Sequence, residues 1–202
     1  MSAWLAAKLL NLFGWEFVGQ LPEPRKVVVV AAPHTSNWDF MYLLLVSNIL
    51  GVRIRWMGKE ELFKGPMSFI SRALGGIPVK RSRSTNMVQQ MAQAFAQRDE
   101  LVLVIPPAGT RRHTDYWRSG FYYIAKESGA PIVLGFVDYG RKRVGFGPSF
   151  HPTGDISADM DFIRAFYADI QGKHPAEKSE PRLRVEDDVQ AAAEDERPPH
   201  AA

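Results

Sequence analysis

Residues 27–40 read VVVVAAPHTSNWDF, and this stretch determines how the rest of the chain is interpreted. Four valines followed by two alanines are typical of a buried strand. Pro33 ends the apolar run, and His34 and Asp39 follow it, five positions apart. A strand, a turn and a helix beginning near Asp39 would place both side chains at the carboxyl edge of a sheet, where open α/β sheets carry their ligand sites.

Strands and helices alternate along the remaining sequence. Strands are predicted over residues 26–32, 52–57, 77–80, 101–105, 131–139 and 143–146. Helices or helical turns are predicted over residues 39–50, 60–63, 66–74, 84–97, 116–128 and 156–170. The helix over 39–50 is apolar nearly all round, so we expect it to be buried. The alternation predicts an α/β fold: a single domain with a mixed sheet flanked by helices.

Composition divides the 202 residues into three segments, 1–20, 21–173 and 174–202. A hydrophobic content of 46% and a charged content of 23% are ordinary for a folded domain. The last segment carries eight acidic and four basic residues and few large apolar ones, so we expect a disordered acidic tail. Because the whole chain carries a net charge of +3, the part before the tail carries +7. That part should favour phosphates or an acidic membrane surface; no nucleic-acid-binding motif is present, and no nucleic-acid partner is expected.

The segment 1–20, MSAWLAAKLLNLFGWEFVGQ, is apolar and aromatic, with Lys8 and Glu16 as its charged residues. It predicts an N-terminal helix that either packs on the core or lies in a membrane interface, and both can hold if the helix is half covered. It lacks the basic start and cleavage site of a signal peptide. The sequence contains no run of about 18 apolar residues, so no transmembrane helix is expected.

His34 and Asp39 are the strongest candidates for chemistry. Histidine is the side chain best suited to remove a proton near neutral pH, and a carboxylate can fix its tautomer. The alternative is a structural histidine beside an unrelated helix-capping Asp. The sequence contains no cysteine, so it offers no thiol nucleophile and no disulfide. No His, Asp or Glu cluster has metal-ligand spacing, and we expect neither a metal nor a redox cofactor.

Two further loops present cations directly after apolar strands. Lys80 and Arg81 end the block GGIPVKRS, and Gly109, Thr110 and Arg111 lie in the block VIPPAGTRR. Arginine suits phosphate because its planar fork donates two parallel hydrogen bonds. The alternative is that these cations form a solvated surface.

Four blocks together resemble the glycerolipid acyltransferases of the PlsC-like, lysophosphatidic-acid acyltransferase family. HTSNWD at 34–39 looks like the family's His-x4-Asp motif. GIPVKR at 76–81, PAGTR at 107–111 and APIV at 130–133 look like its second, third and fourth blocks, in family order. The resemblance implies a glycerol-3-phosphate acyltransferase-like fold. It also implies an enzyme that moves an acyl group from acyl-CoA or acyl-carrier protein to a hydroxyl of a lysophospholipid-type acceptor in phospholipid biosynthesis.

Site roles follow from the same resemblance. His34 would be the general base and Asp39 would orient it, with direct attack and no acyl-enzyme. The acceptor would be bound by Lys80, Arg81, Gly109, Thr110 and Arg111. The implied partners are the lipid acceptor, the acyl donor and a membrane surface. The implied location is peripheral, at the cytoplasmic face of the cell membrane, with no cofactor beyond the donor.

One position departs from the family pattern. The third block normally has a Glu before Gly-Thr-Arg, and this chain has Ala108. The departure leaves open a different acceptor, a lower activity, or a lipid-binding protein that keeps the fold without efficient turnover. A further alternative is a hydrolase in which His34 and Asp39 activate water on a thioester or ester.

Overall fold

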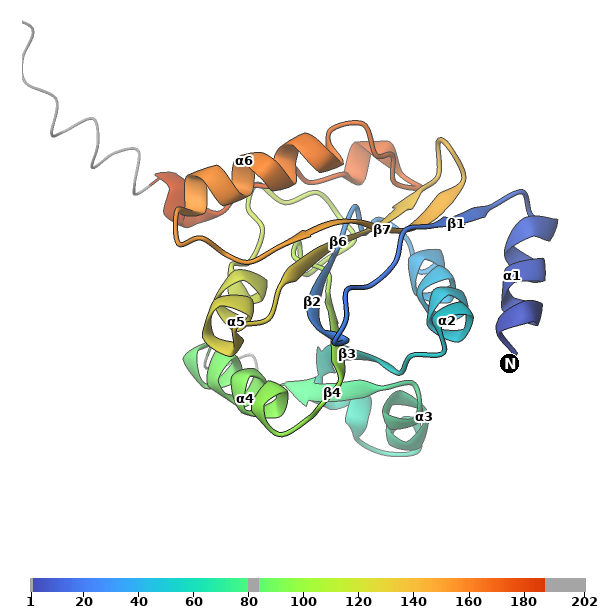
Figure 1. The fold of residues 1–202 in the computed structure, drawn as a ribbon, viewed down its shortest axis with the longest axis horizontal. Helices are drawn as coiled ribbons and strands as arrows, with labels where there is room; N and C mark the ends of the chain where they lie inside the picture. Colours follow the sequence, from blue (N-terminus) through green and yellow to red (C-terminus); the bar gives the residue numbers. More distant parts are fainter. Residues whose placement is uncertain (1, 80–83, 188–202) are drawn as a thin grey trace, which may run out of the picture.

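The computed structural model describes residues 2–79 and 84–187. In this part of the chain the strands form one seven-stranded sheet in the order β1-β7-β6-β2-β5-β3-β4 (Figure 1). The strands are β1 Glu16–Val18, β2 Lys26–Ala31, β3 Ile54–Lys59, β4 Gly76–Val79, β5 Leu101–Ile105, β6 Ile132–Asp138 and β7 Arg143–Phe150. The helices are α1 Ala3–Leu12, α2 Trp38–Leu50, α3 Met67–Ala73, α4 Ser84–Ala96, α5 Gly120–Ser128 and α6 Ile156–Tyr167, with 3₁₀ turns η1 Glu60–Phe63 and η2 Pro175–Glu177.

The sheet is mixed, as the alternation of elements predicted. β2 lies at its centre between β5 and β6 and pairs with both in parallel. β7 runs antiparallel to β6, and it is the single antiparallel neighbour in the described sheet. The carboxyl ends of β2, β5 and β6 therefore meet at one edge, which is where an α/β sheet carries its ligand site.

The valines of β2 are buried on both faces of the sheet. Val28 and Val30 face a core formed with α4, α5 and α6, and Val27 and Val29 face a second core formed with α1 and α2. Alternate residues of a strand point to opposite faces, so an unbroken apolar run requires helices on both sides. Figure 1 shows α5 and α6 on the opposite side of β2 from α1 and α2.

Three helices differ from their predicted form, and the simplest case is α6, which ends at Tyr167 rather than at residue 170. α2 has the expected bounds within one residue but is not buried all round, because Trp38 and Met41 are 55% and 48% exposed. α5 begins at Gly120 rather than at residue 116, because Trp117 pairs with Leu183 in an isolated parallel bridge. Apolar composition alone could not separate a half-covered helix from a buried one.

The N-terminal segment is both helix and strand. α1 ends at Leu12, and β1 then pairs in parallel with β7 at the edge of the sheet. α1 buries Ala6 and Leu10, while Trp4 and Leu12 remain 66% and 76% exposed. The helix is half covered, and the segment 1–20 is not wholly helical, since Glu16–Val18 belong to the sheet.

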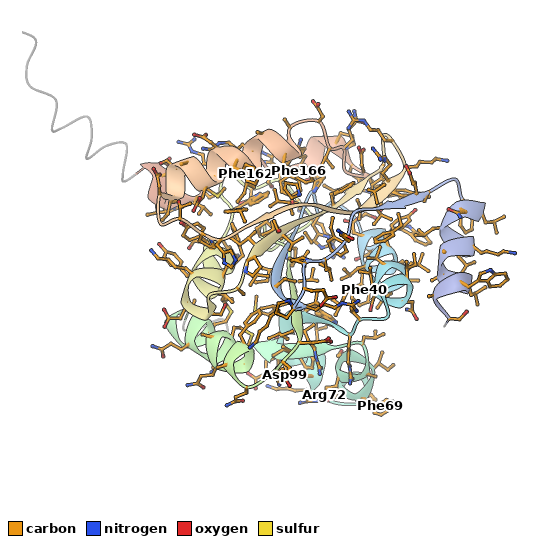
Figure 2. The ribbon with its side chains drawn as sticks, viewed as in Figure 1. Phe40, Phe69, Arg72, Asp99, Phe162 and Phe166 are labelled. Atoms are coloured by element: carbon orange, nitrogen blue, oxygen red, sulfur yellow. The ribbon has the colours of Figure 1, made fainter. Side chains whose placement is uncertain are left out.

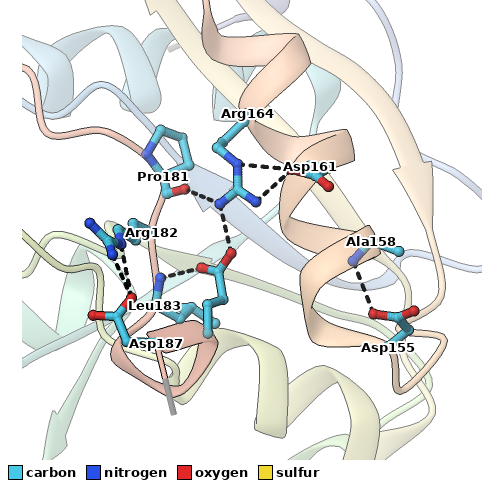
Figure 3. Close-up of polar contacts among 9 residues, drawn as sticks. Asp155, Ala158, Asp161, Arg164, Pro181, Arg182, Leu183 and Asp187 are labelled. Atoms are coloured by element: carbon cyan, nitrogen blue, oxygen red, sulfur yellow. Dashed lines mark hydrogen bonds and ion pairs between the residues drawn. The ribbon is translucent and has the colours of Figure 1, made fainter. Parts of the chain in front are cut away.

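The expectation of a disordered tail from residue 174 is wrong for residues 174–187. Leu183 is fully buried in the core, and Glu186 is 5% exposed. Arg164 of α6 donates to Glu186 Oε1 at 2.7 Å and to the Pro181 carbonyl at 2.9 Å. Figure 3 shows Arg164 beside Pro181. The charge count of the tail did not reveal this packing. An acidic residue can be buried when it pairs with a basic residue of the folded body, and a single buried leucine can hold the segment against the core. The rest of the expected tail, residues 188–202, lies outside the described residues.

Within the described residues, no helix combines the length and the apolar character needed to cross a bilayer.

Candidate active site

His34 and Asp39 are in direct contact at the carboxyl end of β2. The Nδ1 atom of His34 lies 3.0 Å from Oδ2 of Asp39. The same oxygen accepts hydrogen bonds from the backbone N–H groups of Thr35 and Ser36, at 3.1 and 3.0 Å. Because the loop from β2 to α2 folds around one carboxylate oxygen, the spacing of five residues brings the imidazole back onto the carboxylate.

This geometry assigns the two ring nitrogens of His34 different roles. A carboxylate at Nδ1 keeps the proton there, so Nε2 is the nitrogen with a free lone pair. The His34 side chain is 26% exposed and the Asp39 side chain 9%. The imidazole can therefore reach a substrate while the carboxylate behind it stays largely out of water. Asp39 also lies in the first turn of α2, where the helix dipole favours a negative charge.

The other carboxylate oxygen of Asp39, Oδ1, accepts a hydrogen bond from a residue that is distant in the sequence. The Tyr139 hydroxyl donates to Oδ1 at 2.8 Å, across 100 positions of sequence. Burial and the hydrogen bond to Asp39 raise the pKa of Tyr139 well above its ordinary value, so the phenol stays protonated and acts as a donor. Nothing in the local sequence around residue 139 indicated this contact, because it depends on the register of β6 against β2.

The His34–Asp39 pair opens into a pocket of about 1630 Å³. Its polar end is formed by the loop after β2, the loop after β5 and the segment 173–177. Its apolar walls come from α2, β3, η1 and α3. They include Leu43, Trp56, Leu62, Ile70 and Leu74. A site with one cationic, hydrogen-bonding end and one apolar end suits an amphiphile.

The structure brings several predicted site residues together. Gly109, Thr110 and Arg111 line the same pocket as His34 and Asp39. Gly109 has a φ of +68°, and a Cβ there would lie 2.7 Å from Nε of Arg118, so a side chain would be strained at this position.

The remaining predictions about this site have different outcomes. Lys80 and Arg81 lie outside the described residues. Ala108 is partly buried and packs against the core formed with α4, α5 and α6. Phe121 and Tyr122 are fully buried in that same core, so they do not line the pocket.

Sequence reasoning missed the segment 173–177, which had been assigned largely to the tail. The backbone N–H of His174 donates to Thr35 Oγ1 at 3.2 Å, and Glu177 Oε2 accepts from the backbone N–H of His113 at 2.8 Å. Lys173 Nζ lies 5.2 Å from the ring centroid of Trp38. The segment therefore ties the loop after β2 to the loop after β5, and it adds charged groups to the polar end of the pocket.

In residues 2–79 and 84–187, His, Asp and Glu side chains form no group of three or more that could hold a metal ion.

Two comparisons with known proteins found a similar family and a similar fold. The family model described as Acyltransferase matches residues 16–133. The crystal structure of the 1-acyl-sn-glycerophosphate (LPA) acyltransferase PlsC from Thermotoga maritima has a similar fold, with a TM-score of 0.51 and 16% sequence identity over 99% of this chain and 80% of that chain. No curated protein matches the sequence significantly.

Proposed function

Because the chain belongs to the Acyltransferase family, whose model covers residues 16–133, we propose that it transfers a fatty acyl group from a thioester donor to a lipid hydroxyl. The observation that carries this proposal is that the His34–Asp39 pair lines the same pocket as Arg111 and as apolar side chains of α2 and α3. The PlsC structure of similar fold comes from an enzyme that acylates 1-acyl-sn-glycerophosphate, which supports a lysophospholipid-type acceptor.

The chemistry follows from the two nitrogens of His34. Nε2 takes the proton of the acceptor hydroxyl as its oxygen attacks the thioester carbonyl. Asp39 stabilises the imidazolium that forms, because its Oδ2 already accepts from Nδ1. The tetrahedral intermediate then collapses, the C–S bond breaks, and the imidazolium returns its proton to the leaving thiolate. The acyl group passes directly to the acceptor, so no acyl-enzyme forms.

We propose that different parts of the pocket bind the phosphate and the acyl chains of the substrates. Arg111, with the loop at Gly109 and Thr110, would bind the acceptor phosphate, and Lys80 and Arg81 are proposed to join it. The walls from α2 and α3 would hold the acyl chains. The donor is acyl-CoA or acyl-carrier protein, and no further cofactor is required.

A peripheral location on the cytoplasmic face of the cell membrane is proposed from the exposed apolar side chains. Phe13, just after α1, is 67% exposed, and Phe69 of α3 is 81% exposed and lies at the edge of the molecule (Figure 2). α3 also contributes Ile70 to the wall of the pocket, so an apolar acceptor could pass from a bilayer to the site. The basic body of the chain favours an anionic surface.

Ala108 supports a second candidate, a lipid-binding homologue with little turnover. Its methyl group packs partly buried against the core, and no carboxylate stands at this point of the loop. Such a protein would bind anionic lipid regardless of His34. A hydrolase, the third candidate, would release free fatty acid without an acceptor.

The test is acyl transfer from labelled acyl-CoA or acyl-carrier protein to a panel of lysophospholipids, with a control that lacks acceptor. Wild type, His34→Ala and Ala108→Glu are compared. We expect acylated lipid from the wild type and none from His34→Ala, and a higher rate or a changed acceptor preference in Ala108→Glu. Lipid binding without transfer, equal in His34→Ala, would support the binding protein. Label released as free fatty acid in the control would support the hydrolase.

A further inference from the structure

We propose that Tyr139 is a positioning residue of this site, whose hydroxyl holds the second oxygen of Asp39 and thereby fixes the orientation of His34. The expected effect of Tyr139 on the rate of acyl transfer rests on the proposed function. Its expected effect on the orientation of His34 rests on geometry alone.

Tyr139 completes the set of donors around the Asp39 carboxylate. Oδ2 accepts from His34 and from two backbone N–H groups, whereas Oδ1 accepts from Tyr139 at 2.8 Å. With donors on both oxygens, the carboxylate plane cannot turn without breaking a charge-assisted hydrogen bond. Asp39 is 8% exposed, so water does not readily replace a lost donor. Loss of the phenol would let Oδ2 move away from Nδ1 of His34.

The position of Tyr139 is itself fixed before any substrate binds. Its backbone N–H donates to the Gln171 carbonyl at 2.9 Å. The preceding residue, Asp138, is 2% exposed, and its Oδ1 accepts from the backbone N–H of Gly140 at 3.0 Å. The turn between β6 and β7 is therefore held on both sides of Tyr139.

The Tyr139 ring is held as firmly as its backbone. It meets the Trp15 ring edge-on at a centroid distance of 5.0 Å and the Tyr42 ring at 5.8 Å. Edge-to-face pairs restrict the ring plane, and the ring plane sets the direction of the hydroxyl. Trp15 lies between α1 and β1, so the N-terminal segment, although remote from the pocket's polar end, contributes to the position of the catalytic carboxylate.

The phenol also influences where the shared proton resides. The hydroxyl donates to Oδ1 and leaves Oδ2 to accept from Nδ1 of His34, which is the tautomer with the proton on Nδ1. Nε2 is then unprotonated and can accept the proton of the acceptor hydroxyl. Because burial holds the pKa of Tyr139 well above its ordinary value, the phenol remains a donor near neutral pH.

The kinetic test is Tyr139→Phe, which removes the hydroxyl and keeps the ring. The matched control is Tyr122→Phe, which removes a buried hydroxyl that donates to Asp159, also at 2.8 Å, in the core beside α6. We expect Tyr139→Phe to lower kcat about tenfold with KM changed less than about twofold, and Tyr122→Phe to leave both near the wild-type values. In an Asp39→Asn background, Tyr139→Phe should have less than about a twofold effect, because the bond it removes acts through Asp39.

A second readout needs no turnover. The proton on Nδ1 of His34 is observed by NMR in ¹⁵N-histidine-labelled protein, and its resonance is assigned by its loss in His34→Ala. We expect it in the wild type and in Tyr122→Phe, and expect it shifted or broadened beyond detection in Tyr139→Phe. A resonance that Tyr139→Phe leaves unchanged overturns the proposal, whatever the rate, and so does an unchanged kcat in an active enzyme. If the wild type transfers no acyl group, the proposed function fails and the NMR result alone decides the role of Tyr139.

Discussion

Replacement of Leu183 by Ala tests whether the segment after residue 173 belongs to the folded domain. Leu183 is fully buried, and its backbone pairs with Trp117 next to the rings of the larger core. Truncating a fully buried leucine removes its transfer free energy and leaves a cavity, which together cost about 2–5 kcal/mol. For a chain of this length, about 3 kcal/mol corresponds to a Tm lowered by about 6–12 °C.

The assay is thermal and urea denaturation followed by circular dichroism, with Leu12→Ala as the matched control. Leu12 is the same residue type, but it is 76% exposed at the end of α1, so its loss should change the free energy of unfolding by less than about 0.5 kcal/mol. A Leu183→Ala protein whose midpoint matches that of Leu12→Ala would refute the packing of this segment. It would restore the disordered tail that the composition suggested.

Three other predictions concern the sheet edge, high pH and the acceptor. Gly145→Ala should destabilise the protein by about 2 kcal/mol or more in urea denaturation, because a Cβ there meets the Val18 carbonyl; a neutral effect would contradict the β1–β7 pairing. Burial and the hydrogen bond to Asp159 raise the pKa of Tyr122 from 10.0 to about 12. The unfolded chain then loses the Tyr122 proton at a lower pH than the folded chain does. The free energy of unfolding should therefore fall between about pH 10 and 12, and it should fall less steeply in Tyr122→Phe. Equal slopes of unfolding free energy against pH in the two proteins would contradict this prediction. Arg111→Ala should raise KM for a phosphate-bearing acceptor about tenfold or more with a smaller change in kcat, and an unchanged KM would remove Arg111 from the acceptor site.

Much of the fold could be predicted because its core elements are continuous apolar runs. β2 and β5 were found within one residue of their bounds, since strands buried on both faces need no partner to be recognised. β1 was not predicted, because a three-residue edge strand has too short a pattern to separate from the end of a helix. The ordered segment before Asp187 was missed because its burial depends on one fully buried leucine and on the ion pair of Glu186 with the distant Arg164.

The site was predictable to the extent that it lies on loops that directly follow parallel strands. His34 and Asp39 share one loop, and strand order could place Gly109, Thr110 and Arg111 near them because both loops follow parallel strands. Tyr139 and the segment 173–177 reach the site through the antiparallel turn after β6 and through the packing after α6. The local sequence around Tyr139 and around residues 173–177 does not indicate that either of them reaches the site.

The most direct test of the central claim is the rate of acyl transfer to a lysophospholipid by His34→Ala and wild type, each shown by denaturation to be equally folded. Because the His34 side chain is partly exposed and its loss leaves no buried cavity, the two proteins should unfold at similar temperatures. We predict that the rate falls by at least about a thousandfold in His34→Ala, as expected for removal of the general base from a coupled pair. A rate within a few-fold of wild type would show that His34 does not take the acceptor's proton, and it would contradict the mechanism built on the His34–Asp39 pair.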